Sequence, residues 1–271
     1  MSNLRRFICV LVMVSWSGVA WGESDFWEEM TNPGITQYRD LIEQATQALA
    51  TGTFDAALPA LNRAAALLPR DSAALAWRAY VLSKLGRFDE AVIQWQEARQ
   101  RGARLVDDER WAFECTVSLA RVGRYAEAAE LYGQMLARGV SSERRATVLV
   151  NLADMLVLAN CPDLTEAVEL YREAVRAYPH FPAAHWGLAA ALVRRGEPEE
   201  AQAELAAAMR LDPQWQSFSN PTLFLVPPAV IHLHRALGWN HLGHHAEAER
   251  ELQAHLTGAA DDACRVEQLP R

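Results

Sequence analysis

The sequence predicts an all-α fold in which about six antiparallel helix-turn-helix units stack into a right-handed solenoid. Helical periodicity of apolar residues runs almost throughout the chain, and strand signals are nearly absent. A pattern of turn residue, alanine and large side chain recurs at intervals of 34 to 47 residues. Of the 271 residues, 51% are hydrophobic and 22% are charged, which argues against a disordered chain.

Residues 1–22 have the composition of a secretory signal peptide. Arg5 and Arg6 precede an uncharged run at 7–16, and the small residues Ala20 and Gly22 stand just before Glu23, where we expect cleavage. The apolar stretch 7–22 has only 16 residues, short of the roughly 20 that a membrane-spanning helix needs. We therefore expect the protein to be secreted across an inner membrane into the periplasm, without membrane insertion of the mature chain.

Residues 23–37 form an N-terminal capping or docking segment ahead of the first repeat. Phe26 and Trp27 make this segment too apolar for a free tail. It either covers the first helix pair, because terminal repeats need a cover, or docks into a partner. We favour the capping role.

Six segments within residues 38–256 share one pattern. Each begins with a turn residue, at Gly52, Gly86, Gly123, Pro162, Gly196 and Gly243. Five residues later stands an alanine that lets two helices approach closely: Ala57, Ala91, Ala128, Ala167, Ala201 and Ala248. Four residues beyond, a large side chain fills the space where the helices diverge: Leu61, Trp95, Tyr132, Tyr171, Leu205 and Leu252. In three units a proline then ends the second helix, at Pro69, Pro179 and Pro213.

This pattern resembles that of the tetratricopeptide-repeat (TPR) family, over six units that cover residues 38–256. The match is strongest in the second, fourth and fifth units. The third unit lacks the terminal proline, the fourth has Pro162 in place of the turn glycine, and the sixth has His244 and His245 in its turn. The resemblance implies a continuous solenoid with one concave and one convex surface.

Two segments fall outside the repeats. The 47-residue interval before the last unit predicts an insertion at about residues 214–228. Its Phe-Leu-Val run at 224–226 would have to be covered by the scaffold, so we expect a packed loop. The C-terminal tail, residues 257–271, contains Asp261 and Asp262 and little apolar content, so we expect it to be loosely ordered.

The family resemblance implies that the first helix of each pair lines a concave groove. Projecting these helices directs a mostly apolar set inward: Ile42, Tyr80, Phe113, Val117, Leu149, Leu152, Leu156, Trp186 and Leu233. Arginines lie at the edge of this set. Such a groove suits an amphipathic helix or an extended apolar segment of a partner protein. Alternatively, these residues pack against neighbouring units, or the chain's own termini fill the groove.

The sequence therefore predicts an exported protein-interaction scaffold that holds a peptide or helix of a partner protein in its apolar groove, as part of a cell-envelope assembly. The alternative is a structural module that fills its groove with its own termini and self-associates into a homo-oligomer. The identity of the partner is not predicted.

Other function classes lack their signatures. The net charge of -8 and the pI of about 5.5 argue against a nucleic-acid partner. The sequence contains no nucleophile elbow, phosphate-binding loop or dinucleotide fingerprint, so we predict neither an enzyme nor a cofactor. The segment with His241, His244 and His245 suggests a metal site, but the turn at Gly243 separates these side chains. Structural or exposed histidines are therefore the better interpretation.

Three cysteines remain after the signal peptide. Cys115 lies on the core stripe of a helix, and we expect it to be buried. A bridge between Cys161 and Cys264 stays open as an alternative. Three sparse cysteines make neither a disulfide framework nor a metal site.

Overall fold

The computed structural model describes residues 34–69, 71–102, 108–159, 163–219 and 225–267, with side chains described up to residue 258. The expected signal peptide and the capping segment as far as residue 33 lie outside these ranges. Cys161 and the side chain of Cys264 lie outside them too, so their pairing stays a prediction.

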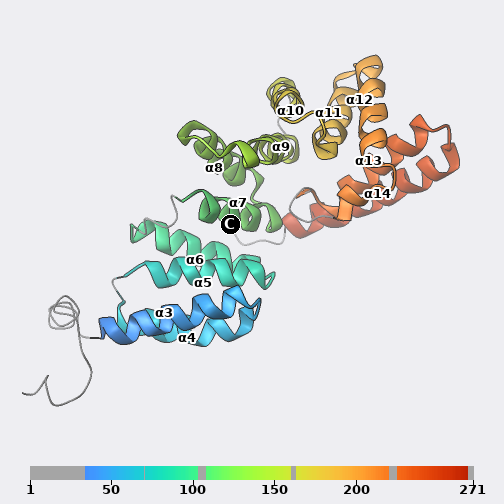
Figure 1. Cartoon of the computed structure of the whole chain (residues 1–271). Coiled ribbons are helices and arrows are strands. Elements are labelled where there is room, and N and C mark those ends of the chain that lie inside the picture. Colours follow the sequence, from blue (N-terminus) through green and yellow to red (C-terminus); the bar gives the residue numbers. More distant parts are fainter. Residues whose placement is uncertain (1–33, 70, 103–107, 160–162, 220–224, 268–271) are drawn as a thin grey trace, which may run out of the picture.

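Six helix pairs follow one another along the described chain (Figure 1). They are α3 (Ile35–Ala50) with α4 (Phe54–Leu67), α5 (Ala73–Lys84) with α6 (Phe88–Gln100), α7 (Glu109–Arg121) with α8 (Tyr125–Arg138), α9 (Ser142–Leu158) with α10 (Thr165–Ala177), α11 (Pro182–Arg195) with α12 (Pro198–Leu211), and α13 (Pro228–His241) with α14 (His245–Glu267). A short 3-10 helix, η2 (Gln216–Ser219), lies between the last two pairs. The described residues form no strand, and the predicted all-α solenoid is confirmed.

Glycine and proline set the helix ends that the sequence pattern predicts. The turn inside five of the pairs contains a glycine with φ between 73° and 79°, at Gly52, Gly86, Gly123, Gly196 and Gly243. Glycine takes this left-handed conformation without steric cost, so the chain can reverse within a few residues. Three second helices, α4, α10 and α12, end two residues before a proline, at Pro69, Pro179 and Pro213.

The first helices of successive pairs lie on the inner side of the stack. Besides the contacts within pairs, α5 contacts α7, α9 contacts α11, and α11 contacts α13. Successive second helices make no contact of similar extent with one another in the described part of the chain. Elements that approach one another more closely lie on the inside of a curve. The first helices α5, α7, α9, α11 and α13 therefore line the concave side of the stack shown in Figure 1.

Each of the first five units contributes an alanine and a large side chain to the core between its helices. The repeat alanines of the first five units are at most 1% exposed: Ala57, Ala91, Ala128, Ala167 and Ala201. The large side chains four residues later are buried as well: Leu61, Trp95, Tyr132, Tyr171 and Leu205. Because each unit shares its apolar surface with its neighbours, stacking rather than any single pair stabilises the fold.

The last unit departs from this burial pattern. Leu252 on α14 holds the same repeat position as Leu205 on α12, yet 43% of its surface is exposed, against 4% for Leu205. In the earlier units the following pair covers this face. No described helix pair follows α14.

We expect the substitution Leu205→Ala to lower the free energy of unfolding by about 2–3 kcal/mol, because it removes buried methyl groups and leaves a cavity. At the same repeat position, Leu252→Ala should change the free energy of unfolding by less than about 1 kcal/mol. Urea unfolding followed by circular dichroism measures both values. Equal losses for the two variants would show that α14 is covered in solution.

The segment between α12 and α13 packs onto the inner side of the stack. Phe218 and Val226 are buried in the core that α9 to α12 form. Leu225, only 2% exposed, is buried instead in the core that α5 to α9 form. The described ends of the insertion thus contact two separate parts of the solenoid, as their apolar sequence requires.

Two helices extend beyond the ranges expected from the sequence. α3 begins at Ile35, three residues before Tyr38, directly after Gly34 with φ 93°. α14 continues to Glu267, within the range 257–271 in which we expect the C-terminal tail.

α14 packs closely on α13 as far as Gly258. A Cβ atom added to Gly258 would lie 3.1 Å from the Cβ atom of Ala229, and His255 Nδ1 lies 2.8 Å from the Ala229 carbonyl oxygen. The small residues let the two helices run side by side past the end of the repeat. Although α14 has 23 residues, no helix in the described ranges is both long and apolar enough to cross a membrane.

Candidate functional site

The structure divides the nine residues expected to line the groove into two groups. Six are half-buried and retain accessible surface: Ile42, Tyr80, Phe113, Val117, Leu156 and Leu233. Three are core residues, with exposed fractions of 1%, 6% and 0%: Leu149, Leu152 and Trp186. As a correction to the predicted set, these three side chains pack inside the protein and offer no surface to a partner.

The insertion after α12 buries Trp186. Its indole lies 5.9 Å from the ring of Trp215 and 5.2 Å from the ring of Phe218, measured between centroids. Gly238 on α13 also packs against it, since a Cβ atom there would lie 3.0 Å from the Trp186 indole. In the described ranges this part of the groove is therefore filled by an internal segment. The alternative stated above, in which the groove is self-filled, expects the chain's own termini in this place instead.

Four of the half-buried residues lie on the first helices of the first three pairs: Ile42 on α3, Tyr80 on α5, and Phe113 and Val117 on α7. We call these four residues the inner surface. Tyr80 rests on a cluster of aromatic rings, because its ring lies 5.0 Å from that of Trp111. Packed aromatic rings hold such a side chain in one orientation, which favours recognition of a partner.

Basic side chains border the inner surface. Lys84 Nζ lies 5.1 Å from the centre of the Tyr80 ring and also pairs with Glu114. The guanidinium of Arg144 lies 5.9 Å from the centre of the Phe113 ring. Cations over aromatic faces are attracted by the ring quadrupole. Basic side chains thus lie beside the accessible apolar side chains, Lys84 paired with Glu114 and Arg144 Nε 3.8 Å from Glu109 Oε1.

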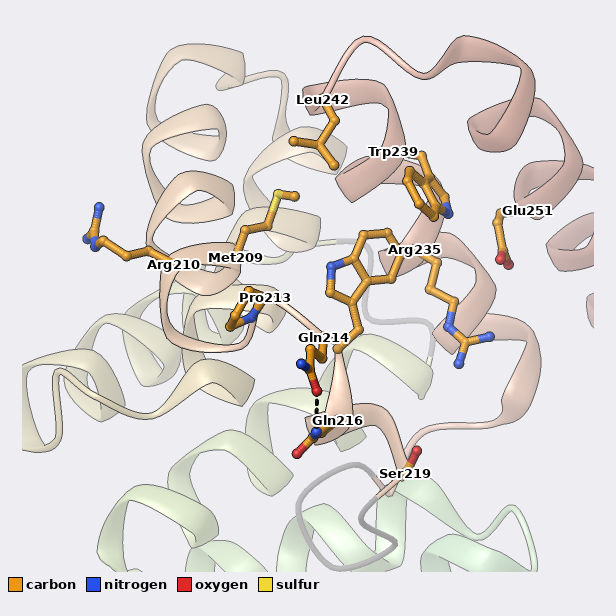
Figure 2. A pocket seen from close by; sticks show the side chains of 11 residues that line it. Met209, Arg210, Pro213, Gln214, Gln216, Ser219, Arg235, Trp239, Leu242 and Glu251 are labelled. Atoms are coloured by element: carbon orange, nitrogen blue, oxygen red, sulfur yellow. Dashed lines mark hydrogen bonds between the residues drawn. The ribbon is translucent and has the colours of Figure 1, made fainter.

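A second accessible site is an open pocket of about 720 Å³ between α12, the insertion and α13. Figure 2 shows Met209 on one side of it, Trp239 and Arg235 on the other, and Leu242 at its edge. Trp215 also lines the pocket, with its ring 4.8 Å from that of Trp239. We call it the Trp215 pocket.

The backbone of Trp215 is strained in a way that shapes this pocket. Its φ is 58°, the left-handed region that side chains other than glycine rarely adopt. The Asp212 carboxylate accepts hydrogen bonds from the backbone N–H groups of Gln216 and Ser217, both at 2.8 Å. These bonds fix the turn and offset the strain, so the indole is held in place.

The clustered histidines of the last turn lie at the surface. His241, His244 and His245 are exposed where α13 meets α14. His245 Nδ1 lies 3.2 Å from the side-chain oxygen of Asn240. In the part of the chain that the structure describes, no group of three or more His, Cys, Asp or Glu side chains is placed to hold a metal ion.

Cys115 lies in the core that α5 to α9 form, with 6% of its surface exposed, which confirms its expected burial. Burial raises the pKa of its thiol to about 12. The thiol is therefore protonated at neutral pH and is a poor nucleophile.

Sequence reasoning missed a buried carboxylate, Asp154 on α9, and the Trp215 pocket. A signal for the first is present, because Asn151 and Asp154 are the two polar residues in the otherwise apolar run 148–158. Asp154 is 3% exposed. Burying an ionisable side chain is unfavourable unless it has a partner, so a buried carboxyl group is a candidate for a functional role.

Known proteins share this architecture. Sequence models described as tetratricopeptide repeat match residues 42–103 and 163–219. YrrB, described as a TPR protein with an unusual peptide-binding site, superposes with a TM-score of 0.59 at 15% identity, over 73% of this chain and 96% of YrrB. MamA from Desulfovibrio magneticus RS-1 gives 0.56 at 18% identity, over 68% and 97% of the two chains. Pseudomonas aeruginosa pilF gives 0.53 at 18% identity, over 80% and 90%.

At these identities the solved structures establish the fold and nothing more. No curated protein sequence matches the chain. The two repeat matches cover helices α3 to α6 and α10 to α12, and the glycine turns and buried alanines continue the pattern between them. Residues 42–103 and 163–219 of the chain are therefore tetratricopeptide repeats.

Proposed function

We propose that this protein is an exported interaction scaffold that binds a peptide or helix of a partner protein on its inner surface, within a cell-envelope assembly. The repeat fold supports a scaffold, because stacked units present an extended concave surface. The observation on which the proposal rests is the accessible aromatic and apolar stripe of Tyr80, Phe113 and Val117. The peptide-binding site in the description of YrrB agrees with this class of ligand.

The charges around the stripe favour an amphipathic, acidic partner segment. The whole chain has a net charge of -8, yet Lys84, Arg110 and Arg144 lie beside the rings of the inner surface or the ring cluster under it. A segment with apolar side chains at helical spacing and acidic side chains between them would complement both features. The composition of residues 1–22 supports export.

A photocrosslinking amino acid is incorporated at position 113, and crosslinking is carried out in the exported compartment. This experiment tests both the cellular location of the protein and its partner-binding surface. We expect it to trap one partner, whose crosslinked segment is then synthesised and titrated against the purified protein. Phe113→Ala and Tyr80→Ala should each weaken binding by about 1–3 kcal/mol, because interface aromatic anchors contribute on that scale.

Two variants serve as controls for this titration. Ile93 on α6 is 59% exposed, away from the inner helices, and Ile93→Ala should leave the affinity unchanged. Trp239→Ala, in the Trp215 pocket, should leave it unchanged as well. If Trp239→Ala weakens binding and Phe113→Ala does not, the inner surface is not the site and the proposal is wrong.

A further inference from the structure

A separate cavity of about 460 Å³ lies where α9, α10 and α11 face the last helix pair. Its walls include Val157, Ala190, Val226 and Leu233. Five polar side chains, each from a different helix, also reach it: Asp154, Tyr171, Arg194, His234 and His255. This size, with mostly apolar walls and a few convergent polar groups, is typical of small-molecule sites.

Asp154 is the polar group whose bonding is incomplete. Its Oδ1 accepts a hydrogen bond from the Tyr171 hydroxyl. Its Oδ2 is buried and has no hydrogen-bond partner in the described part of the chain. Leaving a buried carboxylate oxygen unpaired is unfavourable, and burial accordingly raises the pKa of Asp154 to about 7. A hydrogen-bond donor placed at Oδ2 would remove this penalty.

The other titratable groups leave room for a positively charged donor. His255 Nδ1 lies 2.8 Å from the Ala229 carbonyl oxygen, which can only accept, so Nδ1 bears a proton and points away from Asp154 towards this carbonyl. Burial lowers the pKa of His234 to about 4, so this ring is uncharged at neutral pH. Arg194 also lines the cavity and its charge acts on Tyr171, but the side chain is exposed, where water and salt screen that charge.

We propose that this cavity binds an organic ammonium group attached to an apolar chain. The ammonium donates to Asp154 Oδ2, and the chain lies against Val157, Ala190 and Val226. A free alkylamine and the lysine side chain of a polypeptide share this chemistry. The inference does not depend on the inner surface, whose four residues take no part in the cavity.

Calorimetric titration with 1-hexylamine, and with 1-hexanol as its uncharged counterpart, tests the proposal on the full mature chain. The amine should bind at least about tenfold more tightly than the alcohol. It should bind at least about tenfold more weakly to Asp154→Asn. Its affinity should rise about tenfold between pH 6 and pH 8, as the Asp154 carboxyl ionises.

A second variant keeps the test valid if Asp154→Asn does not fold. Ala190→Leu places a larger side chain in the cavity while Asp154 stays intact, and it should abolish amine binding. Phe113→Ala should leave amine binding unchanged, so failure here and failure of the proposed partner site are distinguishable. Equal affinity of amine and alcohol, equal affinity of wild type and Asp154→Asn, or no binding at about 10 mM amine would overturn the proposal.

The source of the ammonium is settled by a peptide pair. We titrate Ala-Leu-Lys-Leu-Ala with its amino terminus acetylated, so that the lysine bears the single ammonium group, and the same peptide with acetyl-lysine. If the lysine peptide binds tenfold more tightly than 1-hexylamine and the acetylated peptide does not bind, the ligand is a polypeptide side chain. If the free amine binds more tightly than the lysine peptide, the ligand is a small amine. Either result supports the ammonium site.

Discussion

Replacing Gly187 by alanine should destabilise the protein by about 3 kcal/mol or more. A Cβ atom at this position of α11 would lie 2.3 Å from Cε1 and 2.6 Å from Cζ of Tyr171 on α10. The Tyr171 ring cannot withdraw freely, because it is buried and its hydroxyl donates to Asp154. Overpacking costs about 1–3 kcal/mol, and breaking the buried hydrogen bond between Tyr171 and Asp154, which leaves polar groups unsatisfied, costs about 1–3 kcal/mol. Their sum exceeds the gain of about 1 kcal/mol in helix propensity.

A matched control separates this clash from the general effect of glycine in a helix. Gly133 lies within α8, and a Cβ atom there would meet no atom within 4 Å. Gly133→Ala should therefore be neutral or stabilise the protein by up to about 1 kcal/mol. Urea unfolding followed by circular dichroism compares the two variants. Similar free energies of unfolding for both would contradict the close approach of Gly187 to Tyr171.

A double-mutant cycle then assigns the loss to the tyrosine ring. Tyr171→Leu removes the atoms that the new methyl group would strike. In the Gly187→Ala background this substitution should cost less stability than it does in the wild type. Identical costs in the two backgrounds would mean that another neighbour of Gly187 causes the loss.

The repeat architecture could be predicted from the sequence because its determinants are local. The glycine at each turn, such as Gly86 with φ 74°, and the proline after a second helix act on their own few residues. The alanine at a fixed distance from the turn acts only within its own pair. A fixed spacing in the sequence therefore maps directly onto a fixed place in each unit.

The accessible part of the groove could not be predicted because it depends on a contact between distant segments. Helical projection places Trp186 and Leu152 on the inner side, but projection includes only the helix itself. The insertion returns to that side, so that Phe218 packs on Trp186 and Leu225 joins the core of α5 to α9. The apolar run 224–226 indicated that the insertion would be covered, and the structure shows which part of the solenoid covers Leu225 and Val226.

Asp154 should make the stability of the protein fall as the pH rises. Burial raises its pKa from 3.8 to about 7, so the folded state keeps a proton that the unfolded chain has lost. The stability that the protonated carboxyl contributes is complete below about pH 4 and is lost as the pH rises through about 7. Asp154→Asn is uncharged at every pH and can still accept the hydrogen bond from Tyr171. Between pH 5 and pH 8 the variant should gain about 2–3 kcal/mol over the wild type, at about 1.4 kcal/mol per unit of pKa difference.

The comparison with the variant also removes the opposing effect of His234. Burial lowers the pKa of His234 from 6.5 to about 4, so its contribution to stability is present above pH 6.5 and is lost as the pH falls towards 4. Both proteins contain His234, and its contribution cancels in the difference between their free energies of unfolding. Urea unfolding at pH 5 and pH 8 measures that difference, and an identical value at the two pH values would show that Asp154 ionises normally in the folded state.

An ammonium ligand binds the ionised carboxylate, so saturating 1-hexylamine at pH 8 should raise the stability of the wild type and leave that of Asp154→Asn unchanged.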